Sequence, residues 1–129
     1  MKLVIPGEPK AKQRPRHGKG FTYTPKQTVD YENYVKWCFV ESKGKLMDGQ
    51  LKAEIKAFFP IPKSYTKKKK KAIENGLRPT KKPDLDNIAK SVLDSLNGLA
   101  YKDDSQVVIL NIEKHYGDPR VEIEIEEVK

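Results

Sequence analysis

The sequence predicts an α+β fold, a single small domain in which a mixed sheet of about four strands carries helices packed on one face. Apolar and polar residues alternate in short runs near both ends and in the middle of the chain, as they do in half-buried strands. Two longer stretches repeat apolar residues every three or four positions, as amphipathic helices do. A length of 129 residues suits one domain, so residues 1–129 are treated as one unit.

The first third of the chain predicts a strand, a basic loop and a helix. Lys2–Ile5 forms the strand, which Pro6–Gly7 stops. Residues 8–20 are polar and rich in lysine, arginine, proline and glycine, which predicts an exposed loop. A helix is expected from Thr28 to about Ser42, where the residues at helical spacing are Val29, Tyr31, Tyr34, Val35, Cys38 and Phe39.

The middle of the chain predicts one strand and one short basic helix. Residues 51–59 alternate and Pro60 ends the pattern; the face expected to be buried consists of Leu51, Ala53, Ile55 and Ala57. The lysine run Lys67–Lys71 follows. Either Ser64 or Thr66 can cap a helix there, and Gly76 can end it.

The last third predicts a second amphipathic helix and two strands. The helix begins near Leu85 and ends at Asn97–Gly98, and its apolar positions are Leu85, Ile88, Ala89, Val92, Leu93 and Leu96. Val107–Tyr116 and Val121–Val128 alternate as strands, with turn residues between them. Because this connection is short, we expect the two strands to pair as a hairpin.

Charge is distributed unevenly along the chain. Residues 1–82 hold 21 Lys and Arg against 7 Asp and Glu, whereas residues 83–129 hold 5 against 11. A basic surface around a small acidic cluster suits a protein that holds a polyanion near a divalent cation. No apolar run approaches the ~20 residues that span a membrane. A single cysteine, Cys38, excludes an internal disulfide and fits a reducing cytoplasm.

Carboxylates stand at two places where a cation could bind. Asp84 and Asp86 bracket the start of the last predicted helix, and Asp103–Asp104 precede the strand after it. Mg²⁺ prefers oxygen ligands and commonly takes one or two carboxylates, with water and phosphate completing its shell. Lys90, one turn after Asp86, could contact a phosphate. The helical wheel turns Asp94 further towards solvent.

The same residues have ordinary structural uses, and these alternatives stay open. An aspartate before a helix commonly caps it and complements its dipole, and Asp-Asp pairs are frequent in turns. Asp86 and Lys90 could simply pair along the helix. The lysine run could be a solvated helix face, or it could follow a DNA backbone without reading its sequence.

The two acidic segments together form a recognisable motif. Asp84–Asn87 reads Asp-Leu-Asp-Asn, Lys90 follows, and Asp103–Val107 reads Asp-Asp-Ser-Gln-Val. In order and spacing this pattern resembles the RusA family of Holliday junction resolvases. The segment Pro6–Arg16, which begins Pro-Gly-Glu-Pro and ends Arg-Pro-Arg, and then Tyr23–Pro25 are also similar to the N-terminal part of phage-type members.

The resemblance implies a RusA-like fold and a small homodimeric endonuclease that uses Mg²⁺, with Mn²⁺ able to substitute, and no small-molecule cofactor. It also implies which residues form the site. Asp84, Asp86 and Asp104 match the catalytic, metal-binding carboxylates, Asp103 is a further candidate ligand, and Lys90 matches the catalytic lysine.

The expected function is Mg²⁺-dependent resolution of four-way (Holliday) DNA junctions by paired symmetric nicks in recombination or repair. The protein, encoded by a bacterium or a phage, would act in the cytoplasm as a homodimer on branched DNA. No membrane partner is expected. A non-catalytic basic DNA- or RNA-binding module is the alternative. The residues expected to contact DNA are Lys12, Arg14, Arg16, Lys67, Lys68, Lys69, Lys70, Lys71, Lys81 and Lys82.

Overall fold

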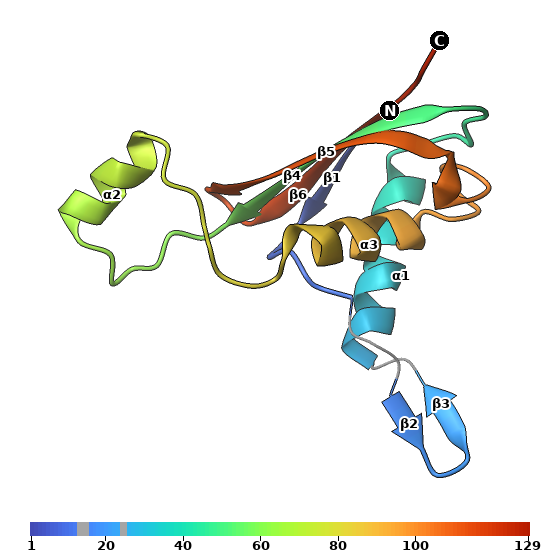
Figure 1. The fold of residues 1–129 in the computed structure, drawn as a ribbon, viewed down its shortest axis with the longest axis horizontal. Helices are drawn as coiled ribbons and strands as arrows, with labels where there is room; N and C mark the ends of the chain where they lie inside the picture. Colours follow the sequence, from blue (N-terminus) through green and yellow to red (C-terminus); the bar gives the residue numbers. More distant parts are fainter. Residues whose placement is uncertain (13–15, 24–25) are drawn as a thin grey trace.

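A four-stranded mixed sheet forms the centre of the computed structural model, which describes residues 1–12, 16–23 and 26–129 (Figure 1). The sheet order is β1–β6–β4–β5, and β2 and β3 form a separate hairpin. The strands are β1 Lys2–Pro6, β2 Arg16–Gly18, β3 Phe21–Tyr23, β4 Leu51–Phe59, β5 Val107–Tyr116 and β6 Arg120–Glu127. The helices are α1 Lys26–Glu41, α2 Lys67–Glu74, α3 Leu85–Ser95 and the short 3₁₀ helix η1 Asp104–Gln106.

One face of the sheet is buried because apolar and polar residues alternate along β1, β4 and β6. The buried positions are Leu3 and Ile5, then Leu51, Ala53, Ile55, Ala57 and Phe59, then Val121, Ile123 and Ile125. Helices α1 and α3 pack together and share this core with the sheet. The α+β class, with a mixed four-stranded sheet, is therefore confirmed.

Helix α2 does not belong to this layer. It buries no residue and stands on an arm that projects away from the sheet (Figure 1). The predicted cap is Thr66, whose hydroxyl accepts a hydrogen bond from the Lys69 amide at 3.2 Å. Gly76 follows the helix with φ of 107°, a backbone conformation that favours glycine.

The predicted hairpin of the last two strands is wrong. β4 lies between β5 and β6, pairing parallel with β5 and antiparallel with β6. The connection passes over the end of β4, where the Gly117 amide donates a hydrogen bond to the Phe59 carbonyl at 2.9 Å. Three extended residues reach about 10 Å, which is enough to step across one strand. A short connection therefore did not require its two strands to pair.

The basic N-terminal segment also contains structure that the sequence did not predict. Residues 16–23, expected to lie mostly in a loop, contain the β2–β3 hairpin. Gly20 turns the chain with φ of 78°. A Cβ built at Gly18 lies 2.3 Å from the tip of the Phe21 ring, so a larger residue here would require this exposed ring to shift.

For both α1 and α3, the sequence placed slightly too many residues on the buried face of the helix. In α1, Val29 and Tyr34 are 39% and 36% exposed, while the rest of the predicted stripe is buried. In α3, Leu85 is 37% exposed, and burial begins one turn later at Ile88. The first turn of α3 therefore stands clear of the core. Among the described residues, no helix is both long enough and apolar enough to cross a membrane.

Candidate metal and nucleic-acid site

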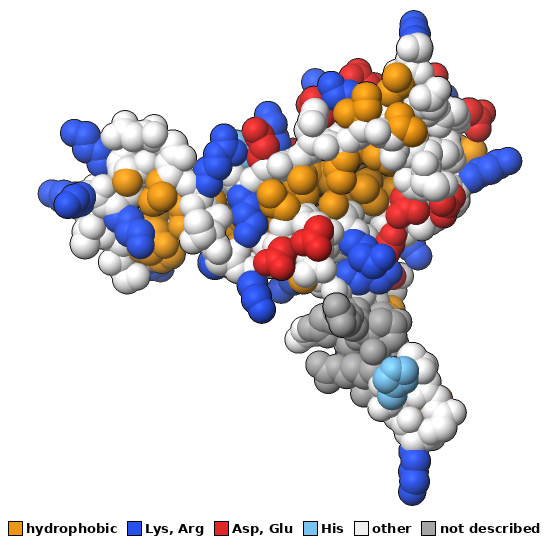
Figure 2. All heavy atoms as spheres, viewed as in Figure 1, with side chains coloured by type: hydrophobic (Ala, Val, Ile, Leu, Met, Phe, Trp, Pro, Cys, Tyr) orange, Lys and Arg blue, Asp and Glu red, His pale blue; other side chains and the backbone are white. Residues whose placement is uncertain are grey.

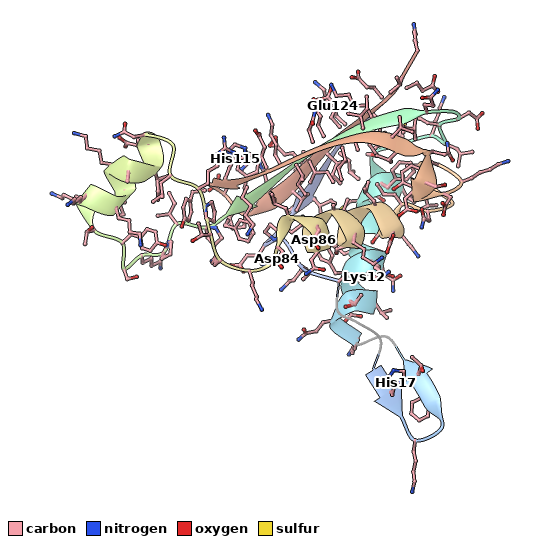
Figure 3. All side chains as sticks on the ribbon, in the orientation of Figure 1. Lys12, His17, Asp84, Asp86, His115 and Glu124 are labelled. Carbon is pink, nitrogen blue, oxygen red and sulfur yellow. The ribbon has the colours of Figure 1, made fainter. Side chains whose placement is uncertain are left out.

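The first two candidate carboxylates stand at the start of α3 (Figure 3). Asp84 immediately precedes the helix in extended backbone conformation, yet its side chain makes no capping hydrogen bond. Asp86 lies in the first turn, and both residues are exposed. The helix dipole favours negative charge at this end. Because Asp84 is not used as a hydrogen-bonding cap, its carboxylate is available to an external cation.

Lys90 lies one turn further along α3 and keeps most of its side chain in solvent. Its Nζ lies 3.8 Å from Oδ2 of Asp94, and its side chain is 64% exposed. Such exposed ion pairs contribute only about 0.3–0.5 kcal/mol on a helix. The amine of Lys90 can therefore turn to a phosphate at little energetic cost.

Asp94 was predicted to point further towards solvent, and this is wrong. Its side chain is only 18% exposed, and Lys12 Nζ donates a hydrogen bond to its Oδ2 at 2.7 Å. Lys12 also lies 3.6 Å from Glu32 of α1, so the N-terminal segment is tied to both helices. A helical wheel cannot show that a distant segment packs over one of its edges. The sequence did contain one sign that Asp94 has a partner: it stands four residues after Lys90, the spacing of ion pairs along a helix.

Asp104 lies in the loop between α3 and β5, where Asp103 has a structural use. The Asp103 carboxylate accepts a hydrogen bond from the Ser105 amide at 3.1 Å, and the Asp103 amide donates one to Oε1 of Gln106 at 3.3 Å. These two bonds form a capping box on η1. Asp103 therefore has the structural role that the sequence left open for it, as a turn and capping residue. The Asp104 carboxylate instead contacts that of Asp94.

Two side chains for which the sequence predicted no contact hold this loop. Asn97, just after α3, accepts a hydrogen bond from the Asp104 amide at 2.8 Å. The Gln106 side chain donates to the carbonyls of Met47 and Gly49 at 3.3 and 3.1 Å. The motif glutamine therefore anchors the acidic loop to the segment before β4.

The carboxyls of Asp94 and Asp104 are in hydrogen-bonding contact, and their pKa values move in opposite directions. Partial burial acts to raise the pKa of Asp94, but bonds to Lys12 and Asp104 and the charges of Lys12 and Lys90 lower it. Burial, the contact with Asp94 and the charge of Asp103 raise the pKa of Asp104. Asp94 therefore keeps its negative charge to a lower pH than Asp104 does.

The structure brings the predicted carboxylates together only in part. Asp86 and Asp94 are separated by eight helical residues, or roughly 12 Å of rise, and Asp104 lies beside Asp94. Within the described ranges, no three acidic, histidine or cysteine residues are close enough to hold a metal ion together. The donor chemistry at Asp84 and Asp86 nevertheless fits Mg²⁺, since two exposed carboxylates leave room for water and phosphate.

Basic side chains gather on the parts that project from the core. Figure 2 shows lysine and arginine side chains over α2 and along the arm that connects it to the sheet, with acidic side chains on α3 between the projections. All five residues of Lys67–Lys71 are exposed, as are Lys81 and Lys82 at the base of the arm. This arrangement supports the expected contacts of the lysine run with a polyanion.

The remaining candidates for DNA contact differ in status. Lys12 is 25% exposed and already paired with two carboxylates, so its amine is directed into the protein. Arg14 and the side chain of Arg16 lie outside the described residues.

Comparison with known proteins assigns the chain to a family. A family model described as Endodeoxyribonuclease RusA matches residues 6–126. The chain is also similar to Uncharacterized protein YqaN of Bacillus subtilis (strain 168), with 42% identity over 137 residues that cover 99% of this chain and 96% of that protein. The matching family model indicates that this basic α+β domain is a nuclease that acts on DNA. The chain belongs to the RusA endodeoxyribonuclease family.

Proposed function

We propose that the chain is a Mg²⁺-dependent enzyme that resolves four-way DNA junctions by paired symmetric nicks in the cytoplasm, during recombination or repair. The observation that carries the proposal is the start of α3. There Asp84 and Asp86 are exposed, Asp84 makes no capping hydrogen bond, and exposed Lys90 follows one turn later. Family membership supplies the substrate class.

Each side chain has a distinct task in the proposed reaction. Asp84 and Asp86 would hold Mg²⁺, whereas Asp104, the third predicted carboxylate, lies beside Asp94 and would have to move towards the start of α3 to join them. When bound, the ion supplies an activated water and neutralises charge on the phosphate. Lys90 would donate to a phosphate oxygen whose negative charge grows during hydrolysis, where a fixed cation contributes most. Asp103 is the weakest candidate ligand because it caps η1.

The proposed DNA grip is made by the projecting parts of the molecule. Lys67–Lys71 on α2 and Lys81 and Lys82 at the base of its arm would contact phosphates, as would Arg14 and Arg16. Lysine contacts with phosphate contribute affinity without reading sequence. A four-way junction presents two equivalent strands, so two protomers related by a two-fold axis would place one site on each strand.

The direct test is to incubate the protein with a synthetic mobile four-way junction and Mg²⁺. Paired nicks at symmetric positions, lost when EDTA removes the cation and restored by Mn²⁺, are expected. Light scattering should give the mass of a dimer. Tight junction binding without any nicks at millimolar Mg²⁺ would instead support a non-catalytic DNA-binding module, and stronger binding to structured RNA would indicate an RNA partner.

A further inference from the structure

We infer that a cleft beside Asp84 receives one unstacked base of the junction, next to the phosphate that is cut, and that Asn87 contacts the edge of this base. The cleft lies between the segment that follows β1 and the start of α3. The inference rests on the proposed function, and it adds a binding site for a base and a residue that determines where the junction is cut.

The cleft is formed by two parts of the chain that are distant in sequence. Figure 1 shows the segment after β1 passing beside the start of α3. Pro9, Lys10 and Ala11 form one wall, and residues 82–84 together with Asn87 form the other. The volume of about 340 Å³ is near the lower end of the range for pockets that hold small organic molecules. A single base with part of its sugar is a ligand of this size.

The surface of the cleft suits the flat face of a base. Pro9, Ala11 and Pro83 give it apolar walls, and every base has an apolar face that can lie against such a surface. The two lysines that line the cleft, Lys10 and Lys82, are both exposed. Their amines can neutralise the phosphates of the same nucleotide, so the cleft combines the two kinds of contact that a nucleotide requires.

Asn87 supplies the cleft with a hydrogen-bonding group that the protein leaves unused. Its side chain is half-buried in the first turn of α3, and in the part of the chain that the structure describes it makes no hydrogen bond. A side-chain amide both donates and accepts, as the edges of bases do. Because the four bases present different donors and acceptors, a contact with this amide favours some bases over others.

The wall opposite α3 is already fixed in the free protein. At one end, the Gly7 amide donates a hydrogen bond to the Pro119 carbonyl at 3.0 Å. At the other end, Lys12 Nζ donates to Oδ2 of Asp94 at 2.7 Å. Since residues 8–11 are anchored on both sides, the cleft does not have to be ordered when DNA binds, and this lowers the entropic cost of binding.

The position of Asp84 identifies which base enters. Asp84 lines the cleft and also belongs to the proposed cation site. A phosphate held by that cation is bonded directly to its two nucleosides, so one of them lies beside Asp84. In continuous duplex this base is paired and stacked, whereas a base at a crossover has lost part of its stack and leaves it at lower cost. The cleft therefore favours cutting at a branch over cutting in duplex.

The first measurement follows the base without cleavage. A synthetic four-way junction carries 2-aminopurine, whose fluorescence rises when it is unstacked, at one position next to the crossover at a time, and Ca²⁺ replaces Mg²⁺. The wild type should raise the fluorescence severalfold at one position on each cut strand. Ala11→Phe fills the cleft and should abolish the rise while the junction still binds; Ala11→Ser leaves the cleft open and is the matched control. If Ala11→Phe melts well below the wild type, Asn87→Phe fills the cleft from the other wall.

The second measurement maps the nicks made with Mg²⁺ on junctions that differ in the base pairs at the crossover. The wild type should prefer some bases over others by about 5- to 150-fold, the range for an amide that makes two hydrogen bonds to a base edge. Asn87→Ala should lose most of this preference. Asn111→Ala is the control, because Asn111 is an exposed asparagine of β5 that does not line the cleft.

The outcomes separate the inference from the proposed function. If the wild type raises fluorescence at no position, or if Ala11→Phe and Asn87→Phe both fold and raise it equally, the cleft is not a base site, even if the junction is cut. A wild type without base preference, or an unchanged preference in Asn87→Ala, overturns the role of Asn87. A junction that shows the cleft-dependent rise but is never cut overturns the proposed function and supports the base site as part of a DNA-binding module.

Discussion

The side-chain amide of Gln106 donates a hydrogen bond to the backbone carbonyl of Gly49, 57 residues earlier in the sequence, at 3.1 Å. A second bond from the same amide reaches the Met47 carbonyl. These contacts fix the loop that carries Asp104 to the segment before the central strand β4. A residue that looks like part of a chemical motif is therefore a structural anchor for that motif.

Replacing Gln106 with Ala should destabilise the protein and weaken cation binding. Loss of these bonds should lower the free energy of unfolding by about 1–2 kcal/mol. Thermal melting should shift down by roughly 3–8 °C, given the size of the domain. Gln50→Ala is the control, since this neighbouring glutamine is exposed. Equal melting temperatures for Gln106→Ala and wild type would contradict the anchoring role.

The sequence predicted those features that depend on local pattern. Burial of alternate residues in β4 and of Ile88, Ala89 and Val92 in α3 follows from periodicity alone, because it describes which side of an element is apolar. The cap at Thr66 was among the predicted choices, since a cap acts within one turn.

Features that depend on distant segments were missed for a common reason. The separation of β5 from β6 is decided by β4, which inserts between them. The burial of Asp94 is decided by Lys12, which lies 82 residues earlier in the chain. Neither partner leaves a periodic signal near the residue it affects, so no local pattern could have revealed the pairing.

Lys12→Met should lower stability at neutral pH, and the loss should disappear in acid. Lys12 and Asp94 are 25% and 18% exposed, so their ion pair should contribute about 1 kcal/mol, or roughly 3–5 °C. The contacts with Lys12 lower the folded-state pKa of Asp94. The contribution is therefore complete above the unfolded pKa of about 3.9 and is lost as pH falls through the folded value.

Melting curves of wild type and Lys12→Met between pH 7 and pH 2.5 test this prediction. Lys52→Met is a suitable control, because it removes a more exposed pair, with Glu54 at 3.5 Å and side chains 32% and 42% exposed, and should have little effect at any pH. A difference between wild type and Lys12→Met that persists unchanged at the lowest pH would show that lost packing, not the ion pair, explains it.

Asp84→Asn and Asp86→Asn should each abolish cleavage while junction affinity stays the same or rises. Each change removes a charge that would bind the cation and also removes repulsion of phosphate. Because Asp84 makes no capping hydrogen bond, Asp84→Asn should lower stability only by its interaction with the helix dipole, about 0.3–1 kcal/mol. Ca²⁺ should support binding without cleavage, since its larger and looser coordination shell positions water poorly. Cleavage within a few-fold of wild type in either variant would contradict the metal assignment.

Lys90→Ala should reduce turnover much more than affinity. A lysine that contacts a phosphate whose charge increases during the reaction contributes mainly in the transition state, so kcat should fall about 100-fold with KM little changed. The ion pair with Asp94 is exposed on the Lys90 side, and its loss should hardly alter the melting temperature. Single-turnover cleavage measures the effect. An unchanged kcat would show that Lys90 takes no part in the reaction and only forms an ion pair with Asp94.

Replacing all five residues of Lys67–Lys71 with glutamine should weaken binding to junctions and to linear duplex by the same factor. These lysines are exposed on a helix that buries no residue, so the change should leave the fold intact. Each lost phosphate contact should reduce the slope of log K against log salt by about 0.9 on duplex arms, because fewer counterions are released. Affinities measured from 50 to 300 mM salt give this slope, and circular dichroism verifies folding.

The control variant replaces five other lysines with glutamine, so that the net charge changes equally. These lysines lie on the face of the sheet away from the helices and just after α1: Lys2, Lys43, Lys45, Lys52 and Lys56. If the α2 variant and this control alter the slope equally, the lysine run acts only through net charge, and the N-terminal arginines must supply the specific grip.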